Sequence, residues 1–250
     1  MVSIFFTIEF FFLKIWYTRF NQLNESEDIK MDILETMKAR HSVRQYKNQA
    51  IESSKREKIN ALIKDVNAES KLSIQVFYDE PKCFDSFMAH YGKFENVKNY
   101  IAIVGNKNDQ EKAGYYGEKI VLKCQKLGLN TCWVAMTHGK SKAQIKRGQK
   151  LLIIISLGYG ETQGVPHKSK SIAELGQADQ KNEWFEKGME AVSLAPTAVN
   201  QQKFYFELKN GIVTAKNLGG FYSRIDLGIV KYHFEAVTGH EVKQCRTLLS

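Results

Sequence analysis

The sequence predicts an α+β fold in which helices flank a central mixed or antiparallel sheet. Segments with the helical repeat of apolar residues alternate with short strand-like runs, and two such runs are separated by Asn210-Gly211. Asn-Gly favours the type I′ turn of a β-hairpin, so at least one pair of strands is expected to be antiparallel. The chain has only 3 prolines and no low-complexity run, which argues against long disordered linkers.

The composition is that of an ordinary globular protein, with 43% hydrophobic and 25% charged residues among 250. That length suffices for one large domain or two small ones with a well-buried core. The formal net charge of +9 permits an anionic ligand, but the lysines are scattered and form no stripe with aromatic residues. We therefore expect no nucleic-acid partner.

Residues 1–30 are expected to be an extension outside a domain that spans residues 31–250. Residues 4–17 are rich in Phe and Ile, yet they are too short and too charged for a membrane span and lack the features of a signal peptide. Three interpretations stay open: a membrane-surface anchor, a helix packed on the domain, or upstream sequence with Met31 as the true start. We favour the third, because the recognisable pattern begins just after Met31.

The domain is expected to begin with two helices and a strand. Asp32 and Glu35 have the spacing of a capping box, which predicts a short helix. Ser54 and Glu57 repeat this spacing before apolar residues at helical intervals, so a second helix is predicted there. Residues 72–77 alternate in polarity like a half-buried strand.

The middle of the chain predicts three strands and one long helix. An apolar strand over residues 100–104 precedes a helix over 115–129, in which Gly128 is placed to end the helix in the left-handed conformation. Strands are also predicted over 130–135 and 151–157. The second of these is apolar except for one serine, as in a strand buried on both faces.

The last third of the chain predicts two helices around the hairpin. A helix over residues 178–194 is ended by a proline, and strands over 204–208 and 212–215 form the hairpin. Asp226 is placed to cap a final helix that stops at Gly239.

Neither a metal site nor a protein nucleophile is predicted. The 4 cysteines are irregularly spaced, and Cys124 and Cys132 lie in apolar surroundings, so we expect reduced core thiols in a cytoplasmic protein. His233 and His240 are seven residues apart, but no carboxylate or cysteine completes a ligand set. No Ser/His/Asp or Cys/His arrangement indicates nucleophilic catalysis.

Two polar segments are candidates for ligand binding. Residues 40–44, Arg-His-Ser-Val-Arg, combine two guanidinium groups with a hydroxyl, a donor set that suits a phosphate monoester, although a solvated basic surface is an equally good interpretation. In residues 195–202, Thr197, Asn200 and Gln202 offer the donors and acceptors that the pyrimidine edge of an isoalloxazine ring requires. The alternative for this second segment is an ordinary helix end with turn-forming residues.

Four segments together resemble the nitroreductase family of FMN-binding flavoproteins. Residues 40–44 are similar to its phosphate-binding run, and 117–133 resemble its central helix and the following strand. Residues 151–160 resemble its strand ending in Leu-Gly-Tyr, and 195–202 resemble its Ala-Pro-Ser-x-x-Asn-x-Gln loop. This loop comes late in the chain, which resembles a subgroup of the family with two related halves in one chain.

The resemblance implies approximate halves 31–170 and 171–250, packed as a pseudo-dimer in a nitroreductase-like fold. It implies an FMN-dependent NAD(P)H oxidoreductase, with ping-pong hydride transfer through flavin N5 to nitroaromatic, quinone or similar small acceptors. The expected assembly is a monomeric pseudo-dimer or a homodimer, without membrane attachment unless residues 4–17 are retained as an anchor. The alternative function is a non-catalytic flavin-binding sensor or storage protein.

The same resemblance implies the roles of individual residues. The flavin carries the chemistry, so no catalytic side chain is expected. The phosphate is assigned to residues 40–44, the ring edge and ribityl chain to the loop at 196–202, and main-chain contact near N5 to residues 134–135. The cofactor-binding residues so implied are Arg40, His41, Ser42, Arg44, Val134, Ala135, Pro196, Thr197, Ala198, Asn200 and Gln202.

Overall fold

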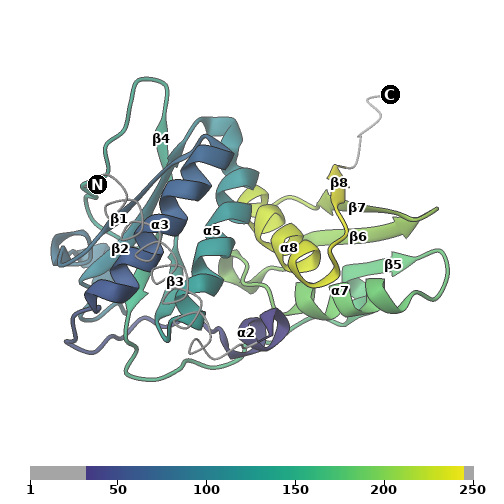
Figure 1. Cartoon of the computed structure of the whole chain (residues 1–250), viewed down its shortest axis with the longest axis horizontal. Helices are drawn as coiled ribbons and strands as arrows, with labels where there is room; N and C mark the ends of the chain where they lie inside the picture. The colour runs from purple at the N-terminus through teal and green to yellow at the C-terminus, as the bar shows by residue number, and fades with distance from the viewer. Residues whose placement is uncertain (1–31, 245–250) are drawn as a thin grey trace, which may run out of the picture. The chain divides into compact units, whose positions relative to one another are not determined.

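The structure, a computed structural model, describes residues 32–244 and divides their strands between two four-stranded sheets (Figure 1). The predicted α+β class is confirmed, and helices pack on both sheets. The first sheet has the order β1-β2-β4-β3 and is antiparallel throughout. Its strands are β1 (Ser73–Phe77), β2 (Asn99–Gly105), β3 (Asn130–Val134) and β4 (Lys150–Gly158).

The second sheet has the order β5-β6-β7-β8 and mixed pairing, in which β6 and β7 are antiparallel while both outer pairs are parallel. Asn210 and Gly211 have φ values of 51° and 72°, as a type I′ turn requires, so the predicted hairpin is confirmed. The two sheets are therefore paired differently. The predicted relationship between the two halves of the chain stays a prediction. The strands are β5 (Gly176–Ala178), β6 (Phe204–Lys209), β7 (Ile212–Asn217) and β8 (Val242–Gln244).

Two long helices, α5 (Gln110–Lys126) and α8 (Ser223–Thr238), pack against each other between the two sheets (Figure 1). Helix α5 also contacts the first sheet, and α8 contacts the second. The other helices are α2 (Ile33–Ala39), α3 (Ser53–Ser70), α4 (Phe87–Tyr91), α6 (Ile172–Leu175) and α7 (Glu183–Ser193). All of these elements belong to one compact unit, Ile33–Ser250.

Local signals located some helix ends correctly and others wrongly. Gly128 follows α5 with a φ of 73°, which confirms the predicted left-handed end. Ser54 does not cap α3, because the N-cap residue is Glu52 and its side chain makes no capping bond. Ala178 ends the strand β5, which pairs with β6, instead of starting the helix predicted over 178–194, and α7 begins only after its cap, Asn182.

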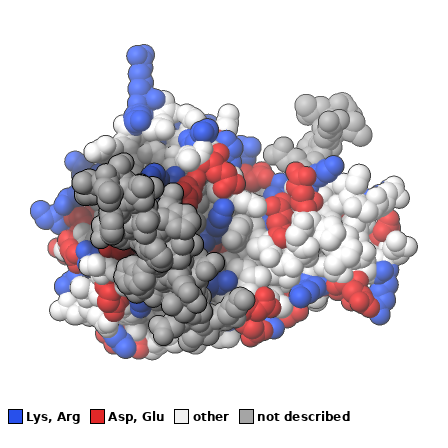
Figure 2. All heavy atoms as spheres, viewed as in Figure 1, with Lys and Arg blue, Asp and Glu red and all other residues white. Residues whose placement is uncertain are grey.

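The extension at residues 1–30 lies outside the described residues, so its three interpretations stay open. No helix among residues 32–244 is long and apolar enough to cross a membrane. On the face drawn in Figure 2, Lys and Arg side chains are interspersed with Asp and Glu.

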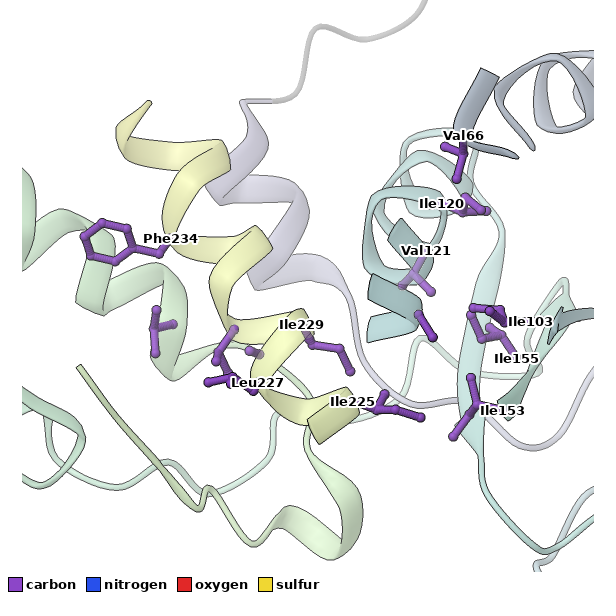
Figure 3. Close-up of a cluster of buried hydrophobic side chains, with 14 of the residues drawn as sticks. Val66, Ile103, Ile120, Val121, Ile153, Ile155, Ile225, Leu227, Ile229 and Phe234 are labelled. Atoms are coloured by element: carbon purple, nitrogen blue, oxygen red, sulfur yellow. The ribbon is translucent and has the colours of Figure 1, made fainter. Parts of the chain in front are cut away.

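One hydrophobic core serves both sheets (Figure 3). Ile103 and Ile155 of the first sheet and Val121 of α5 are fully buried in it. The same cluster contains Phe206 of the second sheet and Phe234 of α8, whose rings stack with centroids 5.4 Å apart. Each such side chain contributes about 1.5–3 kcal/mol when it is buried, so this shared core holds the two sheets together.

Helices α5 and α8 approach closely because each places a glycine at their contact. A Cβ atom on Gly114 would collide with the carbonyl oxygen of Ile225, and one on Gly228 would collide with the carbonyl oxygen of Glu111. The obstacle in both cases is backbone, which cannot rotate away as a side chain would. The separation of the two helices therefore requires glycine at both positions.

We predict that Gly228→Ala lowers the free energy of unfolding by about 3 kcal/mol or more, because the added methyl forces α5 and α8 apart. Urea denaturation measures the loss. The control is Gly148→Ala at an open turn with a φ of 84°, where only the left-handed backbone is strained, at about 1–2 kcal/mol. Equal losses in the two variants would show that the helix contact tolerates a side chain.

Candidate functional site

A cavity of about 320 Å³ brings together segments that are far apart in the sequence. The segments after α2, at the end of β3, after α7 and at the start of α8 all contribute to its lining. Six of the eleven residues predicted to bind a cofactor line it: Ser42, Arg44, Ala135, Pro196, Thr197 and Ala198.

The cavity combines apolar walls with a cationic part of its lining. Trp133, Ile225 and Ile229 form part of the apolar wall. Ser42 and Arg44 also line the cavity and are exposed, and Arg44 makes this part of the lining cationic. Among the described residues, no carboxylate forms an ion pair with Arg44, and its guanidinium carbon lies 5.9 Å from the centroid of the Phe94 ring. This part of the lining is therefore free to bind an anion.

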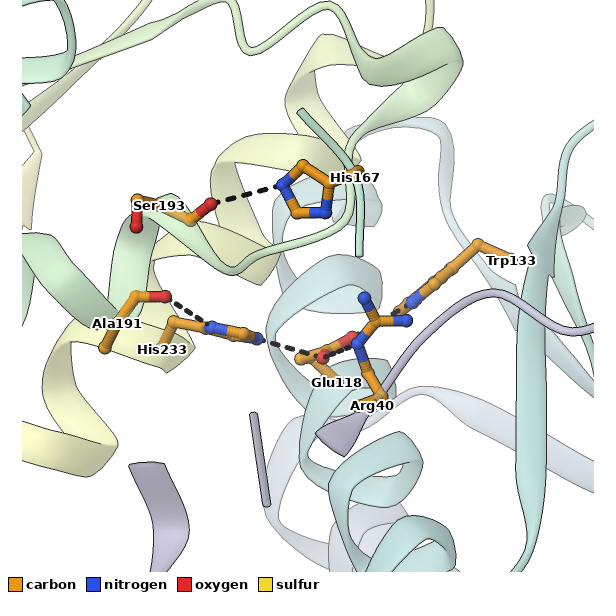
Figure 4. Close-up of polar contacts among 7 residues, drawn as sticks. All are labelled: Arg40, Glu118, Trp133, His167, Ala191, Ser193 and His233. Atoms are coloured by element: carbon orange, nitrogen blue, oxygen red, sulfur yellow. Dashed lines mark hydrogen bonds and ion pairs between the residues drawn. The ribbon is translucent and has the colours of Figure 1, made fainter. Parts of the chain in front are cut away.

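Arg40 does not line the cavity but is buried beside it, with 3% of its surface exposed. Its Nε lies 3.9 Å from Oε1 of Glu118 and has no hydrogen-bond partner (Figure 4). Burial lowers the pKa of Arg40, although the nearby Glu118 carboxylate opposes this shift. His41 follows Arg40 at partial burial, and burial together with the Arg40 charge lowers the pKa of its imidazole.

Glu118 is the centre of a buried polar cluster (Figure 4). Its Oε1 lies 3.0 Å from Nε2 of His233, and its Oε2 accepts a hydrogen bond of 3.0 Å from the indole N–H of Trp133. Burial opposes ionisation of Glu118, but the hydrogen bond and charge of His233 lower its pKa below the ordinary value. His233 Nδ1 also faces an acceptor, the carbonyl oxygen of Ala191 at 2.8 Å. Both ring nitrogens therefore face oxygen atoms that can accept a hydrogen bond.

This cluster was not predicted from the sequence. His233 was considered as a metal ligand beside His240 and as part of the last helix, and Glu118 lies within the α5 pattern as an ordinary polar residue. The two residues are far apart in the chain, and only the packing of α5 on α8 brings them together. No local signal in the sequence would have identified the pair.

The loop after α7 has a strained backbone where it borders the cavity. The φ values are 46° at Val199, 53° at Asn200 and 45° at Gln202. Residues other than glycine rarely adopt this region of backbone conformation. Each such residue costs about 1–3 kcal/mol and persists only where its surroundings impose the conformation. Thr197 supplies part of that restraint, since its Oγ1 accepts a hydrogen bond of 3.1 Å from the Gln202 N–H.

The amides of Asn200 and Gln202 bind the protein's own backbone instead of pointing into the cavity. Each donates a hydrogen bond of 2.9 Å to the carbonyl oxygen of Lys168, and Gln202 Oε1 accepts one of 2.8 Å from the Lys170 N–H. Neither residue lines the cavity, and Val134 is buried in β3. Contact of these residues with a cofactor stays a prediction.

Asp226 lines the cavity and fixes the loop from the α8 side. Its two carboxylate oxygens accept hydrogen bonds of 2.9 Å from the Ala198 N–H and 2.7 Å from the Gln201 side-chain amide. The predicted capping role is wrong, because Asp226 lies in the first turn of α8 and the N-cap is Tyr222. Burial raises the pKa of Asp226 to about 6, although both hydrogen bonds oppose the shift.

The described cysteines, Cys83, Cys124 and Cys132, are buried free thiols, as expected for core residues. Burial raises the pKa of Cys124 to about 12, so it is protonated at neutral pH. Cys245 lies outside the described residues. Residues 32–244 contain no group of three or more His, Cys, Asp or Glu side chains arranged to hold a metal ion.

We predict that Asp226 makes the fold less stable as the pH rises from about 4 to about 6. Its pKa is raised from 3.8 to about 6, so the folded state binds the proton more tightly than the unfolded state does. The stabilisation is fully present below pH 4 and is lost as the pH passes through 6, at a cost of about 3 kcal/mol at most. Urea denaturation at several pH values measures this in the wild type against Asp226→Asn.

The Asp226→Asn variant should lack this decline, whereas the exposed control Asp65→Asn should follow the wild type. A constant difference in unfolding free energy between wild type and Asp226→Asn from pH 4 to 7 would contradict the assignment.

The chain is similar to known proteins of one family. A family model described as "Putative TM nitroreductase" matches residues 32–238. No curated protein matches the chain. The crystal structure of a "putative nitroreductase" from Thermotoga maritima is 24% identical, with a TM-score of 0.64 and coverage of 87% of this chain and 90% of its own.

Two other solved structures are less similar overall. An FMN-dependent nitroreductase from Clostridium difficile is 22% identical, with a TM-score of 0.42, and covers 56% of this chain and 92% of its own. A "putative nitroreductase" in complex with FMN from Desulfovibrio desulfuricans is 15% identical, with a TM-score of 0.46, and covers 57% and 93%. The family match itself spans most of the described residues. This chain therefore belongs to the TM nitroreductase family, and the oxidoreductase class expected from the sequence is confirmed.

Proposed function

We propose that this chain is an FMN-dependent NAD(P)H oxidoreductase of nitroreductase type, which acts by a ping-pong scheme on nitroaromatics, quinones or similar small acceptors. The observation that carries the proposal is the 320 Å³ cavity, in which cationic and apolar parts of the lining meet the loop after α7. When bound, FMN would supply the hydride chemistry at its N5.

The residues of the cavity fit an FMN molecule. The volume of the cavity lies near the lower limit of ligand pockets, which measure about 300–1,000 Å³. The walls of the cavity are mostly apolar, as a flat ring system requires. Arg44 offers two parallel N–H donors to a phosphate, and the Ser42 hydroxyl offers a third donor. Arg40 precedes them in the chain and is buried 3.9 Å from the Glu118 carboxylate, with no hydrogen bond to its Nε.

Each wall of the cavity has a distinct role in this proposal. Arg44 and Ser42 bind the phosphate, while Thr197 and the backbone of Ala135 contact the ring system. Ile225 and Ile229 exclude water from one face. Asn200 and Gln202 hold the loop in its strained conformation through Lys168, so that we assign them a positioning role alongside any direct contact.

We further propose that one chain completes the site. Ser42, Arg44 and Trp133 come from residues 31–170, whereas Thr197 and Ile225 come from residues 171–250. This arrangement supports a pseudo-dimer in which the two halves enclose the cofactor, as a monomer or within a homodimer. We also propose that the electron acceptor is a small molecule and that the protein is located in the cytoplasm.

We predict that the purified protein is yellow and releases FMN when denatured. Arg44→Ala should weaken FMN binding about tenfold or more, because a charge-assisted hydrogen bond contributes about 1.5–3 kcal/mol. Fluorescence titration of apoprotein with FMN measures this, with exposed Lys64→Ala as the charge-matched control. A colourless protein that fails to bind added FMN would exclude the proposal, and equal effects of the two variants would show that Arg44 is only a surface cation.

We predict steady-state oxidation of NADPH or NADH when a quinone is added, with parallel lines in double-reciprocal plots. The measurement is the loss of absorbance of the reduced nucleotide. FMN binding without any turnover would contradict the enzyme assignment and favour the sensor or storage alternative.

A further inference from the structure

A second cavity, of about 540 Å³, adjoins the first one. Phe221 and Tyr222 line both cavities, so a single extended ligand can reach from one into the other. The second cavity is also lined by three basic side chains, Lys107, Lys150 and Arg224, and by no Asp or Glu of the described part of the chain. All charged side chains in this lining are therefore positive.

The three cations converge from different elements. Lys150 begins β4 and pairs in register with Gly105, the last residue of β2. Lys107 follows Gly105 closely in the chain and therefore lies near Lys150 at the same end of these two strands. Arg224 lies in the first turn of α8. Within residues 32–244, no carboxylate forms an ion pair with any of the three. Their mutual repulsion is relieved only by an anion or by solvent.

The start of α8 strengthens the preference for an anion. The N–H groups at the start of a helix carry partial positive charge, although in α8 the Ile225 N–H already donates a hydrogen bond of 2.9 Å to the carbonyl oxygen of Tyr222. Tyr222, the N-cap residue, provides no side-chain capping bond. Arg224 adds a cation at this positive end of the helix, where the acidic residue of the first turn, Asp226, already accepts hydrogen bonds from Ala198 and Gln201. Together, the cavity, the unpaired cations and the helix end fit a phosphate group.

We propose that this second cavity binds the 2′-phosphate of NADPH and makes the protein prefer NADPH over NADH. The inference rests on the proposed function, because it places the nicotinamide against FMN held in the first cavity and the adenosine 2′-phosphate in the second. Phe221, which is 45% exposed, offers a ring face on which the adenine stacks. Lys107, Lys150 and Arg224 supply the charge that distinguishes the two nucleotides.

The test is calorimetric titration of the full chain with adenosine 2′,5′-bisphosphate and with 5′-AMP, which lacks only the 2′-phosphate. We expect the bisphosphate to bind at least tenfold more tightly. Each of the variants Lys107→Gln, Lys150→Gln and Arg224→Gln should reduce this difference, and the triple variant should abolish it. The exposed control Lys64→Gln should leave it unchanged. Equal affinity for both ligands, or equal effects of the control and the cavity variants, would overturn the proposal.

A second measurement separates this inference from the proposed function. In the FMN-loaded protein, the triple variant should raise KM for NADPH at least tenfold and leave KM for NADH unchanged. If FMN binds and both nucleotides have the same KM in the wild type, the proposed function stands and the 2′-phosphate site is wrong. If FMN does not bind, the proposed function fails, and the titration with the two adenosine phosphates still decides whether the cavity recognises a 2′-phosphate.

Discussion

The close contact between α5 and α8 is the constraint on which the rest of the structure depends. Backbone meets backbone at Gly114 and Gly228, so the two helices lie nearer than side chains would allow. Helix α5 packs on the first sheet and α8 on the second, and this contact therefore fixes the distance between the sheets. The cavity forms where the start of α8 faces the end of β3, so its width follows from the same contact.

Glu118 adds a polar link to this apolar arrangement. Its carboxylate joins α5 to His233 of α8 and to Trp133 of β3, with Arg40 at 3.9 Å. A buried charge is costly unless it is paired and hydrogen-bonded, and this cluster satisfies both oxygens of the carboxylate. Trp133 also lines the cavity, so the cluster positions one wall of the proposed flavin site. Arg40 is thereby attached to the core, whereas Ser42 and Arg44 that follow it are exposed.

The sequence predicted those features that depend on neighbouring residues. The turn at Asn210-Gly211 and the helix end at Gly128 follow from backbone preferences that act locally, and both were located correctly. The division into two sheets was not predicted, because strand pairing depends on packing between distant segments. Asp226 was predicted to be a cap from its place before the last helix. Its actual partners, Ala198 and Gln201, belong to a loop whose conformation the sequence does not reveal. Some residues that the resemblance named line one cavity in the structure, and only the structure distinguishes Thr197, which lines it, from Asn200, which binds Lys168.

The central claim is that one chain encloses FMN between its two halves, and a crystal structure of the protein grown with FMN tests it most directly. The account predicts one flavin per chain in the 320 Å³ cavity, with its phosphate at Ser42 and Arg44 and its ring beside Thr197 and the first turns of α8. A flavin bound at another position, or one held only between two separate chains, would contradict it.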